Sequence, residues 1–164
     1  MFKIKFNPVS NRNYLRSNKI TAIKFPISDE AIALAQKIII SQETEDRQEL
    51  GERLLDELSD ASQIDIVQLQ IQDGNQYHRR RGGKVVMKRY GSYRLVSKTI
   101  TIPNRTAVRG QIVAGKTFLD TLLHEWLHHY DTLKLKLNSI HSKGFYLRLS
   151  DLKVKLEIPV EKKK

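Results

Sequence analysis

Hydrophobic residues recur at helical spacing in the first half of the chain. One such run predicts a helix from the N-cap Ser28 to about Ile40, with acidic residues in its first turn. A second, acidic helix is predicted over residues 44–58, although Gly51 weakens it by about 1 kcal/mol relative to alanine. Residues 1–27 contain prolines, asparagines and arginines, and we expect a basic N-terminal arm that is extended or partly ordered.

After residue 63 the hydrophobic pattern changes to the two-residue period of strands. Asp73-Gly74-Asn75 indicates a turn, and Tyr77–Lys84 is predicted to form a basic, flexible loop. A tight turn at Gly91-Ser92 is expected to join the next two strands, and Pro103-Asn104 to end the last of them. Together the strands would form a small, mostly antiparallel sheet. The predicted strands are 64–72, 85–90 and 93–102.

Helical spacing returns in the last third of the chain. One helix is predicted over residues 117–134 and a final one over residues 143–156, with Ser142 as its N-cap. Helices, a small sheet and further helices make an α+β domain, which we assign to residues 28–160. A short basic tail, residues 161–164, follows it.

The composition narrows the class of protein. With 164 residues the chain is long enough for one hydrophobic core, and it contains no cysteine. Disulfide scaffolds, zinc ribbons, iron–sulfur clusters and cysteine nucleophiles are therefore excluded. No apolar run reaches the roughly 18 residues of a membrane helix, and the N-terminus lacks the apolar segment of a signal peptide. We expect a soluble protein of the cytoplasm or nucleoid, without a membrane partner.

The net charge of +11, from 29 lysines and arginines against 18 acidic residues, is unevenly distributed. Residues 29–62 carry an excess of acids, whereas residues 1–28 and 63–116 are strongly basic. The excess positive charge is either a solubility feature or a basic face for a polyanion such as DNA. In the basic loop, Tyr77 could stack on an unpaired base, and an ordinary solvated loop is the alternative. The candidate phosphate contacts are Arg79, Arg80, Arg81 and Lys84.

The predicted helix over residues 117–134 contains the pentapeptide His124-Glu125-Trp126-Leu127-His128. Residues i and i+4 lie about 40° apart around a helix, so His124 and His128 can share one metal ion. Glu125 can then reach a water molecule at that ion. The apolar residues of this helix occupy its opposite face, which would anchor the helix in the core and turn both histidines toward a cleft. His129 falls within the apolar arc, and we expect it to be structural.

A third metal ligand has to come from elsewhere in the chain. Our candidate is His141, because the helix capped by Ser142 would hold it rigidly opposite the first two histidines. Three nitrogen ligands leave a fourth position open, which is typical of a catalytic zinc site and predicts one Zn²⁺ per chain. A metzincin needs glycine and histidine where this chain has Asp131 and Lys134, and a thermolysin-like enzyme needs a glutamate near Arg148, so neither pattern fits.

The pattern that fits is HExxH, twelve further residues, and then His141-Ser142-Lys143-Gly144-Phe145. In this the chain resembles the SprT-like zinc metalloprotease family, which includes the Spartan-type DNA–protein crosslink proteases and lies near the WLM and YgjP-like zincins. The resemblance covers roughly residues 63–156, and the family usually has glycine where Ser142 stands. It implies a zincin-like minimal domain with Glu125 as the general base. The zinc ligands that it implies are His124, His128 and His141.

These observations predict a zinc-dependent metallopeptidase that hydrolyses a protein or peptide substrate, including one associated with nucleic acid. Tyr146 and Arg148 are candidate donors to the oxyanion, and the strand over residues 93–102 is a candidate edge for an extended substrate. Asp120 and Asp131 could orient a ligand histidine. Two alternatives stay open: a nucleic-acid-binding protein whose zinc site is structural or vestigial, and a metal-dependent nuclease. The oligomeric state is not determined by these patterns.

Overall fold

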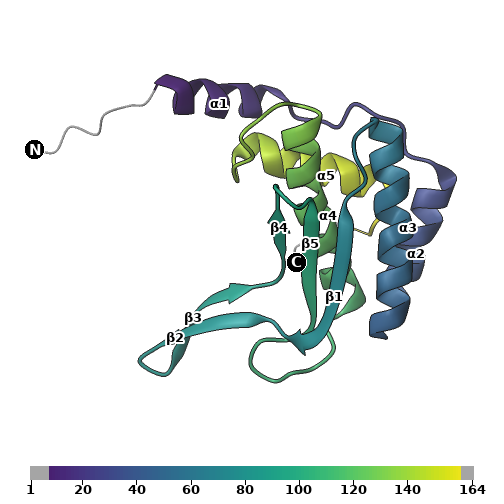
Figure 1. The fold of residues 1–164 in the computed structure, drawn as a ribbon, viewed down its shortest axis with the longest axis vertical. Helices are drawn as coiled ribbons and strands as arrows, with labels where there is room; N and C mark the ends of the chain where they lie inside the picture. The colour runs from purple at the N-terminus through teal and green to yellow at the C-terminus, as the bar shows by residue number, and fades with distance from the viewer. Residues whose placement is uncertain (1–7, 160–164) are drawn as a thin grey trace, which may run out of the picture.

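The structure, a computed structural model, describes residues 8–159 and has the predicted α+β architecture (Figure 1). Among these residues, no helix has the length and apolar character that crossing a lipid bilayer requires. The elements within the described part of the chain are α1 (Pro8–Lys19), α2 (Asp29–Ile40), α3 (Thr44–Ser62), β1 (Gln68–Asn75), β2 (Tyr77–Arg81), β3 (Lys84–Arg89), β4 (Ser92–Arg94), β5 (Thr99–Arg105), α4 (Gly115–Leu133) and α5 (Lys143–Lys155).

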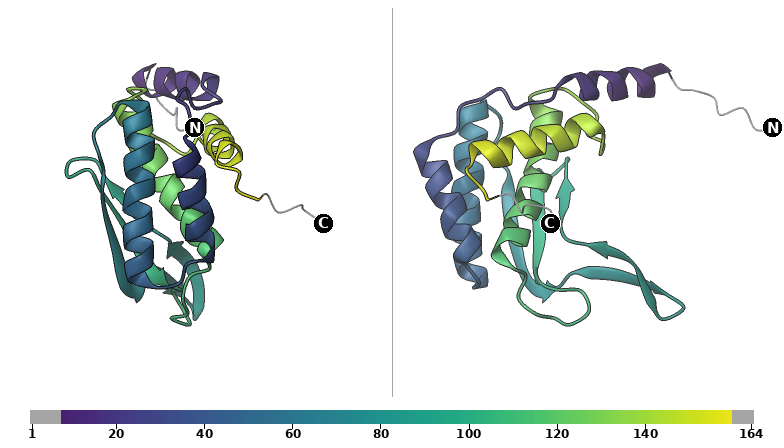
Figure 2. Two further views of the ribbon diagram at one scale, coloured as in Figure 1. Left: turned by 90° about the vertical axis from the view of Figure 1, so that its right-hand side faces the viewer. Right: turned by 180° about the vertical axis from the view of Figure 1, so that it is seen from behind.

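The strands form two separate sheets. In the larger sheet β5 lies between β1, which is parallel to it, and β4, which is antiparallel. This sheet is therefore mixed rather than mostly antiparallel. Strands β2 and β3 form an antiparallel hairpin that projects away from the rest of the domain (Figure 1). Helix α4 packs against β4 and β5, α3 packs against β1, and α2 packs on both helices. Seen from behind, α4 and α5 lie in front of the sheet (Figure 2).

Three predictions about the larger sheet are wrong. Asp73-Gly74-Asn75 is not a turn, because β1 runs through it. The expected single strand over residues 93–102 is instead β4, a turn and β5, which fold back on each other. Strand β5 also continues through Pro103, where a stop was expected. The proline is tolerated there because β4 pairs with β5 only from Thr99 to Thr101 and the next bridge is at Arg105, which leaves one side of β5 unpaired at Pro103.

The segment Tyr77–Lys84 is not a flexible loop. It forms β2, a two-residue turn and the first residue of β3. Gly82 and Gly83 have φ values of 57° and 77°, the left-handed conformation that tight hairpin turns require and that glycine adopts at little cost. The basic residues of this segment therefore lie on a defined ribbon, whose side chains alternate between two faces.

Part of the N-terminal arm, Pro8–Lys19, is helical rather than extended. Helix α1 packs on α5 and on the loop before it. Asn13 donates to the carbonyl of Asn138 at 2.7 Å and accepts from the Asn138 amide at 2.8 Å. A Cβ atom on Gly144 would lie 2.0 Å from the carbonyl oxygen of Ser17, so the two helices approach as closely as glycine allows. The basic residues 1–7 lie outside the described part of the chain.

The predicted helices 28–40 and 44–58 are confirmed, the second with a longer C-terminal end. The Ser28 hydroxyl caps α2 by accepting from the Ala31 amide at 3.0 Å. Helix α3 continues to Ser62. Gly51 has a packing role, because a Cβ atom there would lie 2.7 Å from Leu69 of β1. Its cost in helix propensity is offset by the close approach of helix and strand.

The apolar face predicted for the helix over residues 117–134 is buried, as expected. Trp126 stacks on Tyr130 with ring centroids 5.6 Å apart, and the ring of Phe25 packs against both of them. The Trp126 indole donates to the Ser59 hydroxyl at 3.0 Å, which satisfies its only polar atom. This packing fixes the rotation of α4, and with it the direction of the polar face. The buried apolar residues of α4 are Phe118, Leu119, Leu122, Leu123, Trp126, Leu127 and Tyr130.

Candidate metal centre

Three histidines from two segments meet on the polar side of α4. His124 and His128 lie one turn apart on the helix, and His141 approaches them from the loop that leads into α5. The Nε2 atom of His141 lies 3.0 Å from the Nε2 atom of His124 and 3.0 Å from that of His128. The three potential ligand atoms all lie within 4.8 Å of one another. The structure thus brings together the three histidines that the sequence singled out.

The donor set suits a small cation. In a tetrahedral zinc site with Zn–N bonds of about 2.0–2.1 Å, neighbouring nitrogens are roughly 3.3 Å apart, close to the spacing seen around His141. Burial, followed by the neighbouring histidines, lowers the pKa of His124 to about 4 and that of His128 to about 3. Both imidazoles are therefore neutral near pH 7, which is the form that binds metal ions.

A chain of hydrogen bonds fixes which nitrogen of His128 carries the proton. The Ser139 hydroxyl donates to Oδ2 of Asp131 at 3.1 Å, so it accepts from Nδ1 of His128 at 2.8 Å. The proton on Nδ1 leaves the lone pair of Nε2 directed at the other two histidines. Such a partner behind a metal-binding histidine fixes its tautomer and its orientation.

The ring of Phe145 packs against all three imidazole rings. This residue is fully buried near the start of α5, and its ring stacks on His128 with centroids 4.7 Å apart. Its centroid lies 5.0 Å from that of His124 and 5.4 Å from that of His141. The predicted N-cap places this ring, because the Ser142 hydroxyl accepts from the Phe145 amide at 3.1 Å. Helix α5 therefore positions the third histidine and the ring that supports the cluster.

His129 is structural, as its place in the apolar arc predicted. It is fully buried, and its Nε2 atom donates to the carbonyl of Asp65 at 2.6 Å. Its Nδ1 atom accepts from the Tyr93 hydroxyl at 2.7 Å. Both nitrogens are occupied, so His129 has no lone pair to offer a metal ion.

Arg148 is not an oxyanion donor. Its side chain is fully buried and forms a two-point ion pair with Asp131, with N···O distances of 3.1 and 2.7 Å. It also donates to the carbonyl oxygens of Ser17 and Ile20 at 2.7 Å each. Arg148 therefore holds Asp131, and through it Ser139, behind the histidine cluster. Sequence reasoning missed Ser139 because nothing in a short polar loop distinguishes this serine from a solvated one.

Glu125 lies beside the cluster and is half-buried. Burial raises its pKa to about 7, although the nearby Arg89 guanidinium opposes the shift. Within the described part of the chain no hydrogen bond or ion pair occupies its carboxylate. A carboxylate that titrates near neutral pH is suited to accept and release a proton. A cation held by the histidines would lower this pKa again, because it favours the charged form.

Two grooves meet at the histidine cluster. One has a volume of about 480 Å³ and is lined by residues that include Met87, Tyr90 and Leu149. The other has a volume of about 600 Å³ and runs along β4 toward Asn138. The residues that line both grooves are Arg89, Gly91, His124, Glu125 and His141.

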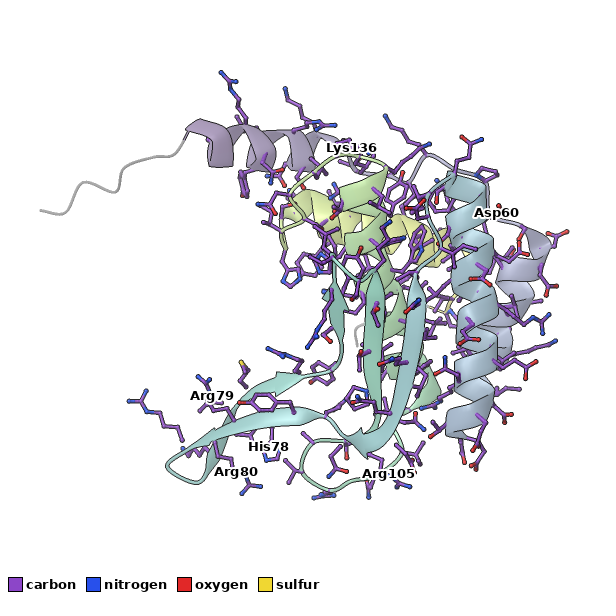
Figure 3. The ribbon with its side chains drawn as sticks, viewed as in Figure 1. Asp60, His78, Arg79, Arg80, Arg105 and Lys136 are labelled. Atoms are coloured by element: carbon purple, nitrogen blue, oxygen red, sulfur yellow. The ribbon has the colours of Figure 1, made fainter. Side chains whose placement is uncertain are left out.

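The remaining predicted site residues are placed differently. Tyr146 is 48% exposed, with its ring centroid 6.0 Å from that of His141, so it stays a candidate donor. Asp120 pairs with Lys153 at 3.0 Å and does not contact a histidine of the cluster. The candidate phosphate contacts Arg79, Arg80, Arg81 and Lys84 are exposed on the hairpin, away from the cluster. Figure 3 shows Arg79 on one side of the ribbon and His78 and Arg80 on the other.

Replacing Ser139 by alanine should lower the affinity for Zn²⁺ by about 10- to 100-fold, because Nδ1 of His128 loses the partner that fixes its tautomer. Competition with a chromophoric chelator measures this affinity. The control is Ser150→Ala, which removes an exposed hydroxyl from α5. Equal affinities in the two variants would show that the Ser139 contact does not orient the imidazole.

Comparisons with protein-family profiles, with curated proteins and with solved structures find no significant match to this chain.

Proposed function

We propose that this protein is a zinc-dependent metallopeptidase with a zincin-like active-site helix. The observation that carries the proposal is the convergence of three imidazole nitrogens beside the unpaired, half-buried carboxylate of Glu125. His124, His128 and His141 would hold one Zn²⁺ where the two grooves meet. Cysteine is absent from the chain, which agrees with a catalytic rather than a structural zinc site.

The chemistry divides between the ion and the side chains. A zinc ion at this centre supplies Lewis acidity, which acidifies water and polarises a carbonyl group. Glu125 accepts the proton of the attacking water and passes it to the leaving amine. Tyr146, at the rim of the cluster, donates a hydrogen bond to the oxygen on which negative charge develops. Gly91 and Ser92, at the start of the edge strand β4, line the groove through which an extended peptide would pass.

Metal analysis of the purified protein tests the first part of the proposal. We expect one zinc per chain in the wild type and loss of that zinc in His141→Ala, since two imidazoles alone do not make a site of this kind. The control is His78→Ala, which removes a partly buried imidazole from the hairpin, away from the cluster. Unchanged zinc content in His141→Ala would contradict the three-histidine site.

The same preparations separate the alternative functions. Hydrolysis of a denatured protein that stops with a chelator and returns with added zinc supports the metallopeptidase. Bound zinc without hydrolysis of any protein indicates a structural or vestigial site. Chelator-sensitive cleavage of an oligonucleotide, with proteins left intact, indicates a nuclease. A DNA contact by the hairpin remains a prediction from its exposed arginines.

A further inference from the structure

The walls of the two grooves differ in charge. Among the described residues that line the larger groove, the charged side chains are Arg89, Arg94 and Glu125. The smaller groove adds Asp120 and Lys153, which neutralise each other in an ion pair of 3.0 Å. The side opposite the histidines therefore presents two cations and, apart from Glu125, no unpaired carboxylate.

Both arginines are available to a ligand. Each is exposed, and neither forms an ion pair with any residue that the structure describes. The Arg89 guanidinium lies 5.7 Å from the centroid of the Tyr77 ring, a cation–π contact that positions it without neutralising its charge. Arg94 lies at the end of the edge strand β4, within the groove that passes the histidine cluster.

The hairpin extends this cationic wall. In the register of β2 and β3, Tyr77 pairs with Arg89 and Arg79 pairs with Met87. Residues two apart on a strand share a face, so these four side chains lie on one side of the ribbon. Met87 and Arg89 line the smaller groove, so this is the side that faces the cleft. Arg80 lies on the opposite side (Figure 3).

We propose that Arg89 and Arg94 select peptide segments that carry an acidic side chain next to the bond to be cleaved. This inference rests on the proposed peptidase function and names its substrate class. Two unpaired guanidinium groups flanking one site attract carboxylates and repel lysine and arginine side chains.

An acidic peptide fits the grooves better than a nucleic acid strand. Apolar side chains of Met87, Tyr90, Leu95 and Leu149 line the grooves between the cations and can receive peptide side chains. A continuous phosphate backbone would bring several charges past Glu125, whereas a peptide can place a carboxylate at each arginine and an uncharged residue at Glu125.

The test uses three fluorogenic peptides that differ only in the residues flanking the scissile bond, which are glutamate, glutamine or lysine. With the zinc-loaded full chain, kcat/KM should favour the glutamate peptide over the glutamine peptide by about 1.4- to fivefold for each arginine engaged, which corresponds to the range of exposed ion pairs. Arg94→Ala should reduce this ratio, and Arg94→Glu should reduce it further, because the new carboxylate offsets the remaining charge of Arg89. Each ratio compares two peptides cleaved by the same variant, so any effect of the substitution on the reactivity of Glu125 cancels.

Arg80→Ala is the control, because it also removes an exposed arginine but from the face of the hairpin that points away from the cleft. At about 0.15 M salt, where charges more than about 8 Å apart are screened, its ratio should equal that of the wild type. Equal cleavage of all three peptides by the wild type would overturn the preference and leave the peptidase intact.

A binding measurement separates failure of the preference from failure of the proposed function. Labelled glutamate and glutamine peptides are titrated into the zinc-loaded Glu125→Gln variant, with and without Arg94→Ala. If no peptide is cleaved by the wild type but the glutamate peptide still binds more tightly in an Arg94-dependent way, the acidic preference stands and the peptidase does not. A single-stranded oligonucleotide that binds in an Arg94-dependent way, while the peptides bind alike, would assign the cleft to nucleic acid and overturn the proposal.

Discussion

Replacing Glu125 by glutamine is expected to abolish peptide hydrolysis while leaving zinc bound. The amide keeps the size of the side chain but cannot accept a proton from water, and loss of a general base lowers rates by about 10²- to 10⁴-fold. None of the three potential ligand atoms belongs to Glu125, so the metal affinity should change little. Initial rates on a denatured protein, together with zinc content, measure both effects on one preparation.

The matched control for this variant is Glu49→Gln, the same substitution at an exposed position of α3. Its rate should equal that of the wild type. Cleavage by Glu125→Gln at the wild-type rate would remove Glu125 from the mechanism and point to another base. Loss of zinc together with activity would instead show that the carboxylate helps to hold the metal.

Asp131→Ala should destabilise the fold by about 3–5 kcal/mol, because it leaves the guanidinium of Arg148 buried without its counter-ion. Burial raises the pKa of Asp131, and the hydrogen bonds from Arg148 oppose that shift. A typical domain is stable by only about 5–15 kcal/mol, so this single change removes a large share of the total. Urea unfolding of the metal-free proteins isolates the effect from zinc binding.

A second ion pair of the same length provides the control. Glu30 and Arg53 also approach to 2.7 Å, but both side chains are 49% exposed, against 0% for Asp131 and Arg148. Glu30→Ala should therefore cost no more than about 1 kcal/mol. If the two alanine variants unfold at the same urea concentration, burial does not set the contribution of the Asp131–Arg148 pair.

Sequence periodicity was most informative where one face of an element is apolar. The stripe on α4 placed Trp126 in the core and left His124 and His128 on the opposite face, which is what the structure has. The N-caps Ser28 and Ser142 were predictable because a serine side chain satisfies a free amide within its own helix end. The strand region was predicted less well, since alternation alone does not reveal which strand is the partner or where a chain doubles back.

Helix α1 shows why the rest of the site was not predictable. It has no apolar stripe, and its stability comes from contacts such as Arg148 to the carbonyl of Ser17, 131 residues away in the sequence. Arg47 is a similar case: this buried arginine donates to Asn104 at 2.6 Å and lies 4.8 Å from the ring centroid of Phe118. A sequence shows an arginine as a charge, and only packing decides whether it is solvated or buried.

The sequence by itself determined helices α2 to α5, the rotation of α4 and the identity of three histidines and one glutamate, because these features depend mainly on residues close together in the chain. The tertiary structure alone decided the mixed sheet and the two faces of the hairpin. It also decided the burial of Arg148, the hydrogen bonds behind His128 and the cationic wall opposite it. These features join segments far apart in the sequence, and their free energy comes from desolvation and packing that exist only once those segments meet.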